Sequence, residues 1–90
     1  MQFEDRVAIV SGAASGMGLL TSQRLAENGA CVVLTDVNEE SVTEAAQKIR
    51  TQGNEAIGVK VDVRCYDEVK AAVALAVEQY GSVDILLNCA

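Results

Sequence analysis

The sequence predicts an α/β fold in which parallel strands alternate with helices. Two observations support this prediction: short apolar runs rich in Val, Ile and Leu alternate with longer segments of helical period, and a glycine follows each helical segment. Strands and helices that alternate at this length form right-handed crossovers and a parallel sheet. The chain is therefore expected to form one domain over residues 1–90, in the order β-α-β-α-β-α-β, without an internal boundary.

Four short apolar runs are the predicted strands, namely Val7–Ser11, Cys31–Asp36, Ala56–Val61 and Val83–Asn88. Nearly continuous aliphatic runs of this kind are typical of parallel strands that helices cover. A doubly wound sheet of the Rossmann type orders such strands 3-2-1-4, with the ligand crevice between strands 1 and 4. Three helices then serve as crossovers, and strand 4 is expected at an uncovered apolar edge.

Three segments between these strands have helical period, namely Met17–Asn28, Glu39–Gln52 and Tyr66–Tyr80. Apolar residues recur along one side of each segment, as expected for helices that pack on a sheet. The predicted apolar stripes are Leu20, Leu25 and Ala26 in the first, Val42, Ala45, Ala46 and Ile49 in the second, and Val69, Val73, Ala76, Val77 and Tyr80 in the third.

The predicted helix ends carry suitable residues. Gly29, Gly53 and Gly81 follow the three helical segments, where a left-handed conformation commonly ends a helix. Asn38 precedes the second helix and can cap it, and the two glutamates after it suit the positive end of the helix dipole.

Composition excludes several classes of function. Half of the residues are hydrophobic and 22% are charged, which is typical of a globular chain. The net charge of −6 and the scattered basic residues argue against nucleic acid or an anionic membrane as a partner. The N-terminus does not resemble a signal peptide, and no apolar run approaches the ~20 residues that span a bilayer. We therefore expect a cytoplasmic protein.

The cysteines Cys31, Cys65 and Cys89 indicate neither a metal site nor a disulfide framework. They are odd in number, lack the spacing of metal ligands, and have no histidine to complete a zinc site. A catalytic cysteine would also lack a histidine as its base. We expect reduced thiols and no bound metal.

The stretch SGAASGMG, residues 11–18, follows a predicted strand and leads into a predicted helix. In that context Gly12 can form the tight turn, Gly16 lets the backbone approach a pyrophosphate, and Gly18 lets helix and strand pack closely. The helix N-terminus offers free N–H groups to the phosphates, and the Ser15 hydroxyl can reach the ribose. The alternative is that these glycines merely permit a tight turn. The flanking elements favour phosphate binding.

Asp36 closes the second predicted strand, 18 residues after Gly18. A carboxylate at this position can accept hydrogen bonds from both hydroxyls of an adenosine ribose, and it would repel a 2′-phosphate. No Arg or Lys stands beside it or within the glycine stretch. These observations favour NAD over NADP, although Asp36 could also be an ordinary residue of a turn.

Four motifs together resemble the short-chain dehydrogenase/reductase family. They are SGAASGMG, Asp36, Asp62-Val63 after the third strand, and LLNCA after GSVDI. The family pattern is T-G-x-x-x-G-x-G, then an acidic residue in NAD-preferring members, then D-V, then N-N-A-G. Two departures are small: Ser11 stands where Thr is usual, and Cys89 replaces the second Asn.

The resemblance implies roles for individual residues. The adenosine ribose and pyrophosphate would be wrapped by Gly12, Ser15, Gly16, Met17 (through its backbone) and Gly18. Asp36 and Val37 would flank the adenine ribose. Asp62 would reach the adenine amino group, with Val63 lining the adenine pocket. Asn88 and Ala90 would support the fourth strand beside the cofactor. A different interpretation makes Asp62 a turn residue before the third helix.

The same resemblance implies hydride transfer between a nicotinamide cofactor and a secondary alcohol or ketone. The family's catalytic Ser, Tyr and Lys follow the N-N-A-G motif, so no residue of this sequence is assigned to them. One literal Y-x-x-x-K runs from Tyr66 to Lys70. It follows the third strand, on the adenine side, and its acids Asp67 and Glu68 suit a helix N-terminus. We do not expect it to be catalytic.

The expected function is the adenosine- and pyrophosphate-binding half of an NAD-dependent oxidoreductase acting on a small alcohol or ketone. The catalytic half is missing from these residues, so the 90-residue chain alone is expected to be inactive. Family members are usually homodimers or homotetramers. The alternative is a truncated, non-catalytic nucleotide-binding module.

Overall fold

The computed structural model describes residues 4–89 and contains the predicted alternation of strands and helices. Five predicted bounds differ: the first helix begins and ends one residue early, the second helix and the third strand each end one residue early, and the fourth strand begins two residues late because Val83 and Asp84 belong to the preceding loop. The elements are β1 (Val7–Ser11), α1 (Gly16–Glu27), β2 (Cys31–Asp36), α2 (Glu39–Thr51), β3 (Ala56–Lys60), α3 (Tyr66–Tyr80) and β4 (Ile85–Asn88).

The four strands form one parallel sheet in the order β3-β2-β1-β4, as predicted. Val7 of β1 pairs with Cys31 of β2, and Ala8 pairs with Ile85 of β4. The chain thus places β2 and then β3 on one side of β1, and it returns to place β4 on the other side of β1. All carboxyl ends of the strands therefore meet at one edge of the sheet, beside β1, where a doubly wound sheet binds its ligand.

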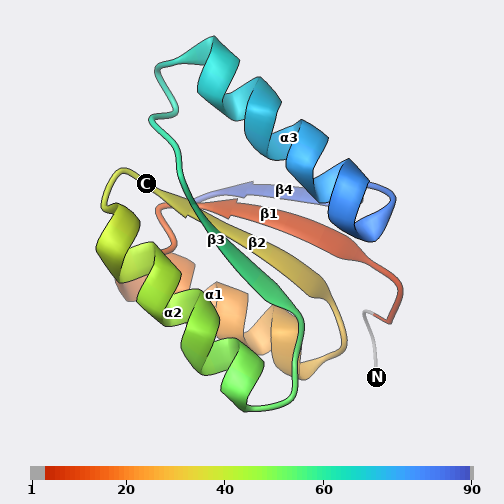
Figure 1. Cartoon of the computed structure of the whole chain (residues 1–90). Helices are drawn as coiled ribbons and strands as arrows, with labels where there is room; N and C mark the ends of the chain where they lie inside the picture. Colours follow the sequence, from red (N-terminus) through yellow and green to blue (C-terminus); the bar gives the residue numbers. More distant parts are fainter. Residues whose placement is uncertain (1–3, 90) are drawn as a thin grey trace.

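Helices cover both faces of the sheet, with α1 and α2 on one face and α3 on the other (Figure 1). Alternate side chains of β1 lie on opposite faces of the sheet: Ala8 and Val10 belong to the core under α1 and α2, whereas Val7 and Ile9 belong to the core under α3. The predicted stripe of α2, which includes Val42 and Ile49, is wholly buried. Burial of these aliphatic side chains provides the main driving force for the fold.

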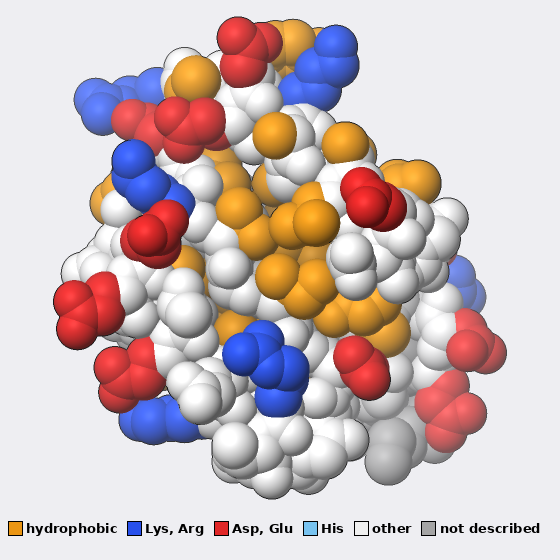
Figure 2. Space-filling model, in the orientation of Figure 1, with side chains coloured by type: hydrophobic (Ala, Val, Ile, Leu, Met, Phe, Trp, Pro, Cys, Tyr) orange, Lys and Arg blue, Asp and Glu red, His pale blue; other side chains and the backbone are white. Residues whose placement is uncertain are grey.

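The face that carries α3 is covered less completely. Figure 2 shows hydrophobic side chains gathered over the sheet beside this helix, with charged side chains around them. One member of the predicted stripe of α3 is correspondingly exposed, namely Val77 at 47%, and on the opposite face Leu20 of α1 is 44% exposed. In α3 the smaller Ala72 and Ala76 are the buried residues, and among residues 4–89 α3 is the only helix on this side of the sheet. Leu86 on the edge strand β4 is 65% exposed.

The predicted helix ends are confirmed. Gly29, Gly53 and Gly81 have φ values of 98°, 90° and 92°, in the left-handed region. The Asn38 side chain caps α2 by accepting a hydrogen bond from Ser41 N at 3.1 Å. These ends fix where the chain turns between helix and strand.

Candidate nucleotide-binding site

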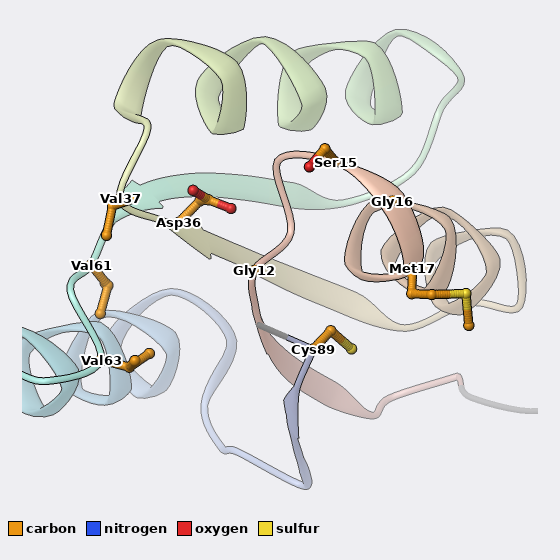
Figure 3. A pocket seen from close by; sticks show the side chains of 9 residues that line it. All are labelled: Gly12, Ser15, Gly16, Met17, Asp36, Val37, Val61, Val63 and Cys89. Atoms are coloured by element: carbon orange, nitrogen blue, oxygen red, sulfur yellow. The ribbon is translucent and has the colours of Figure 1, made fainter.

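A pocket of about 460 Å³ opens at the carboxyl ends of the strands, where the β1–α1 turn, the end of β2 and the segment after β3 come together. Figure 3 shows three valines at one end of the pocket, Met17 and Cys89 at the other, and Asp36 and the glycine turn between them. The lining residues are Gly12, Ser15, Gly16, Met17, Asp36, Val37, Val61, Val63 and Cys89.

The glycine-rich turn has the backbone that its sequence predicts. Gly12 and Gly16 adopt left-handed φ values of 68° and 59°. A Cβ on Gly18 would collide with the carbonyl oxygen of Gly12. The helix α1 can therefore pack this closely against the turn only because residue 18 is a glycine. A Cβ on Gly16 would meet no atom within 4 Å. The space beside Gly16 is therefore open, as a closely approaching ligand requires.

The N-terminus of α1 opens onto this pocket. Ser15 is the N-cap residue, with an extended φ of −157°, but its side chain forms no capping hydrogen bond. The first turn of α1 contains no acidic residue. The amides of the first turn have no partner within the helix. Gly16 and Met17 therefore bring uncapped N–H groups and the positive end of the helix dipole to the pocket wall, an arrangement suited to an anion.

Two backbone amides hold the Asp36 carboxylate at the end of β2. Oδ2 accepts a hydrogen bond from Ala14 N, and Oδ1 accepts one from Asn38 N, both at 3.1 Å. A carboxylate offers about four acceptor positions, so about two remain for a ligand. None of the lining residues is Lys or Arg. The pocket thus combines one fixed negative acceptor with a helix N-terminus.

Asp62 does not line the pocket, although Val61 and Val63 on either side of it do. Its carboxylate accepts hydrogen bonds from Arg64, with Nη2 to Oδ2 at 2.9 Å and Nε to Oδ1 at 3.1 Å. These bonds, followed by one from the Arg64 amide, lower the pKa of Asp62 to about 2. The interpretation of Asp62 as a turn residue before α3 therefore gains support, and its contact with adenine stays a prediction.

Asn88 contacts β1 instead of the pocket. The Ser11 hydroxyl donates a hydrogen bond to Asn88 Oδ1 at 2.9 Å, which joins the carboxyl ends of β1 and β4. The hydroxyl that Ser11 keeps in place of Thr is the donor, and the expected role of Asn88 beside a cofactor stays a prediction. Ala90, predicted to share that role, lies outside the described residues.

Sequence reasoning missed two lining residues, Val61 and Cys89. Val61 directly follows β3, and Val63 lies in the turn that the Cys65 amide closes on the Asp62 carbonyl oxygen, so strand periodicity did not indicate that both would line the pocket. Cys89 follows the end of β4, and its amide donates to the Ser11 carbonyl oxygen at 3.1 Å. The Y-x-x-x-K pair lies elsewhere: Tyr66 is 75% exposed, and neither Tyr66 nor Lys70 lines the pocket.

Comparison with known proteins identifies the family. The family model described as short chain dehydrogenase matches residues 6–90. The chain belongs to the short-chain dehydrogenase family. Of the motifs that resembled this family, the glycine-rich turn, Asp36, Val63 and Cys89 contribute to the pocket lining, whereas Asp62 and Asn88 do not. Among residues 4–89, no helix is long and apolar enough to cross a membrane.

Individual short-chain dehydrogenases match nearly the whole chain. It is 42% identical over 87 residues to the short-chain reductase protein NovJ of Streptomyces niveus, covering 97% of this chain and 33% of that protein. It is 44% identical over 85 residues to cis-4-hydroxycyclohexanecarboxylate dehydrogenase of Sinomonas cyclohexanicum, covering 94% and 34%. A crystal structure of hydroxysteroid dehydrogenase from Escherichia coli superposes with a TM-score of 0.92 at 30% identity, covering 96% and 37%. The chain thus spans about a third of the length of these relatives.

Proposed function

We propose that this chain binds the adenosine and pyrophosphate part of NAD, as the cofactor-binding half of an oxidoreductase acting on a secondary alcohol or ketone. One observation carries the proposal: a carboxylate fixed by two backbone amides shares an open pocket with an uncapped helix N-terminus. This combination matches a ligand that presents hydroxyl donors at one point and phosphate oxygens at another. The family membership supports a nicotinamide dinucleotide as that ligand.

The residues present fit such a dinucleotide. The open space beside Gly16 and the amides at the start of α1 would receive the pyrophosphate. The acceptor positions left on Asp36 would receive the two ribose hydroxyls. At the end of the pocket away from Met17, Val37 would flank the adenine ribose and Val63 the adenine, and the neighbouring Asp62 would meet the adenine amino group. When bound, the nicotinamide ring would supply the hydride acceptor or donor.

The preference for NAD over NADP is part of this proposal. Asp36 is already bonded to Ala14 and Asn38, so it is held in place and cannot easily turn away from a ribose substituent. A 2′-phosphate at that position would place like charges together, and no lysine or arginine of the pocket wall would offset them. The free 2′-hydroxyl of NAD instead donates to the carboxylate.

The proposed reaction is based on the names of the relatives. The hydroxycyclohexanecarboxylate and hydroxysteroid dehydrogenases are named for hydroxy compounds, which supports a small alcohol or ketone as substrate. No residue of these 90 is assigned to the family's catalytic Ser, Tyr and Lys. We therefore propose binding without turnover for the 90-residue chain, and assembly as a homodimer or homotetramer for the complete enzyme. The same lack of assigned catalytic residues favours a second candidate, a nucleotide-binding module without activity.

The binding proposal is tested by titrating NAD into the 15N-labelled chain and following the amide NMR signals. The largest shifts are expected at Gly16, Met17 and Gly18, with a second group at Asp36 and Val37. Shifts confined to other regions, or none at millimolar NAD, would refute it. Appearance of NADH when secondary alcohols are added to the same sample would refute the proposed lack of turnover.

A further inference from the structure

The turn between β3 and α3 fixes Asp62 from three directions. Its carboxylate is bonded by the Arg64 side chain and also accepts from the Arg64 amide at 2.9 Å. Its carbonyl oxygen accepts from Cys65 N at 2.8 Å, which closes the turn. Its amide donates to Glu68 Oε1 at 3.0 Å. Asp62 is therefore held in one orientation between two residues of the pocket wall, Val61 and Val63.

The hydrogen bonds of Asp62 leave one acceptor position free. Oδ1 receives two donors, the amide and Nε of Arg64, whereas Oδ2 receives only Nη2. Since each carboxylate oxygen accepts about two hydrogen bonds, the open position is on Oδ2. The Arg64 guanidinium also keeps the carboxyl ionised at neutral pH, because its bonds lower the pKa of Asp62 to about 2. An ionised carboxylate accepts only, so it suits an amino donor.

We infer that Arg64 is a positioning residue for the adenine end of the pocket, holding the Asp62 carboxylate so that its open acceptor position on Oδ2 meets the 6-amino group of the purine. This inference rests on the proposed function. Arg64 does not itself line the pocket, and its side chain is 87% exposed. It acts on the ligand only through Asp62. The resulting preference is for a purine with an amino donor at position 6.

The substitution Arg64→Ala tests this assignment with little risk to the fold. It removes the two side-chain bonds to Asp62 but keeps the backbone bond from residue 64, so the turn retains its local closure. Lys48→Ala is the matched control: it deletes the same charge from another exposed ion pair, 3.9 Å from Glu44, among residues that do not line this pocket. Arg64→Lys keeps the charge without the paired donors of a guanidinium.

The readout is the affinity for two nucleotides, AMP and purine riboside 5′-monophosphate, which lacks the 6-amino group. In Arg64→Ala, AMP is expected to bind about three- to tenfold more weakly, whereas the purine analogue binds as before. Arg64→Lys is expected to fall between Arg64→Ala and the unsubstituted chain. Lys48→Ala should leave the ratio of the two affinities unchanged. The thermal midpoint of each variant, measured in parallel, reports on the fold.

Two results would overturn the inference. An unchanged or higher AMP affinity in Arg64→Ala would show that the guanidinium does not help Asp62 to bind. If Arg64→Ala weakened the binding of both nucleotides equally, Arg64 would have a general structural role that does not depend on the amino group. Failure of the unsubstituted chain to bind AMP and NAD would instead refute the proposed function, and the inference with it. Binding by the unsubstituted chain with an unchanged ratio in Arg64→Ala would refute the inference alone.

Discussion

Asp36 Oδ2 accepts a hydrogen bond from Ala14 N at 3.1 Å, so the end of β2 is joined directly to the glycine-rich turn after β1. A second amide, that of Asn38, holds the other carboxylate oxygen. The acid proposed to bind the ribose is thus placed by the same turn that is proposed to bind the phosphates. The relative position of these two groups is set before any ligand arrives, which lowers the cost of ordering the site on binding.

Replacing Asp36 tests its role in choosing the cofactor. Asp36→Ala removes the acceptor for the ribose hydroxyls and the charge that disfavours a 2′-phosphate, so NAD should bind about tenfold more weakly while NADP binds more tightly. Adding Val37→Arg should further favour NADP. Calorimetric titration of both cofactors measures the ratio. If the ratio is the same in Asp36→Ala as in the unsubstituted chain, Asp36 does not select the cofactor.

Gly16 and Gly53 offer a matched pair of substitutions. Both have left-handed φ values, 59° and 90°, and a Cβ at either would meet no atom within 4 Å. Gly16→Ala and Gly53→Ala should therefore each cost about 1 kcal/mol of stability through backbone strain. Only Gly16→Ala should also weaken NAD binding, because only Gly16 lines the pocket. Chemical denaturation and calorimetry measure the two effects, and equal NAD affinities in the two variants would contradict the placement of the pyrophosphate.

Substitution of Gly18 tests the close packing of α1 against the glycine-rich turn and not a contact with the ligand. A Cβ here would collide with the Gly12 carbonyl, so Gly18→Ala must push α1 away from the turn. We expect a loss of about 1–3 kcal/mol in the free energy of unfolding, larger than for Gly53→Ala. Urea denaturation of the two variants gives the comparison. A Gly18→Ala variant as stable as the unsubstituted chain would show that the turn is not closely packed in solution.

The hydrogen bonds between Asp62 and Arg64 lead us to expect that the Asp62 carboxyl titrates at an unusually low pH. Hydrogen bonds from Arg64 lower the pKa of Asp62 from 3.8 to about 2. A folded-state pKa below that of the unfolded chain stabilises the fold above the unfolded value, and this contribution is lost as the pH falls from about 4 through about 2. Carbon-detected NMR of the Asp62 carboxyl follows the titration directly. In Arg64→Ala the midpoint should move upward, and an unmoved midpoint would mean that the pair does not form in solution.

The pKa of Tyr80 tests how α3 packs on its face of the sheet. Burial, followed by the negative charge of Glu55, raises the pKa of its phenol to about 12. Ultraviolet titration should show one tyrosine ionising well above the ordinary range, and Tyr80→Phe should remove that transition. If Tyr80→Phe leaves the transition in place, the packing of α3 on the sheet differs from that described.

The sequence was sufficient to predict the sheet order because each part of the pattern has a local physical cause. The aliphatic runs of β1 and β2 need helices on both faces, the glycines after the helices fix the turns, and the doubly wound pattern orders the strands 3-2-1-4. The residues that form the pocket could also be predicted: Asp36 ends a strand and Gly16 begins a helix, and both lie at the carboxyl edge of a parallel sheet.

What the sequence left open depends on side-chain packing and hydrogen bonds that a pattern of residue types does not specify. Periodicity could not show that Val77 is exposed, because its exposure depends on how many helices cover that face. The motif placed Asp62 near the adenine, but only the structure reveals that Arg64, two residues later, occupies three of its acceptor positions. The Ser11–Asn88 hydrogen bond likewise depends on the pairing of β1 with β4.

The most direct test of the central claim is the affinity of the unsubstituted 90-residue chain for NAD and NADP, measured by calorimetry in one buffer. We expect NAD to bind and NADP to bind at least about tenfold more weakly, because the fixed carboxylate of Asp36 accepts from a ribose hydroxyl and repels a phosphate. Equal affinities, or a preference for NADP, would contradict it.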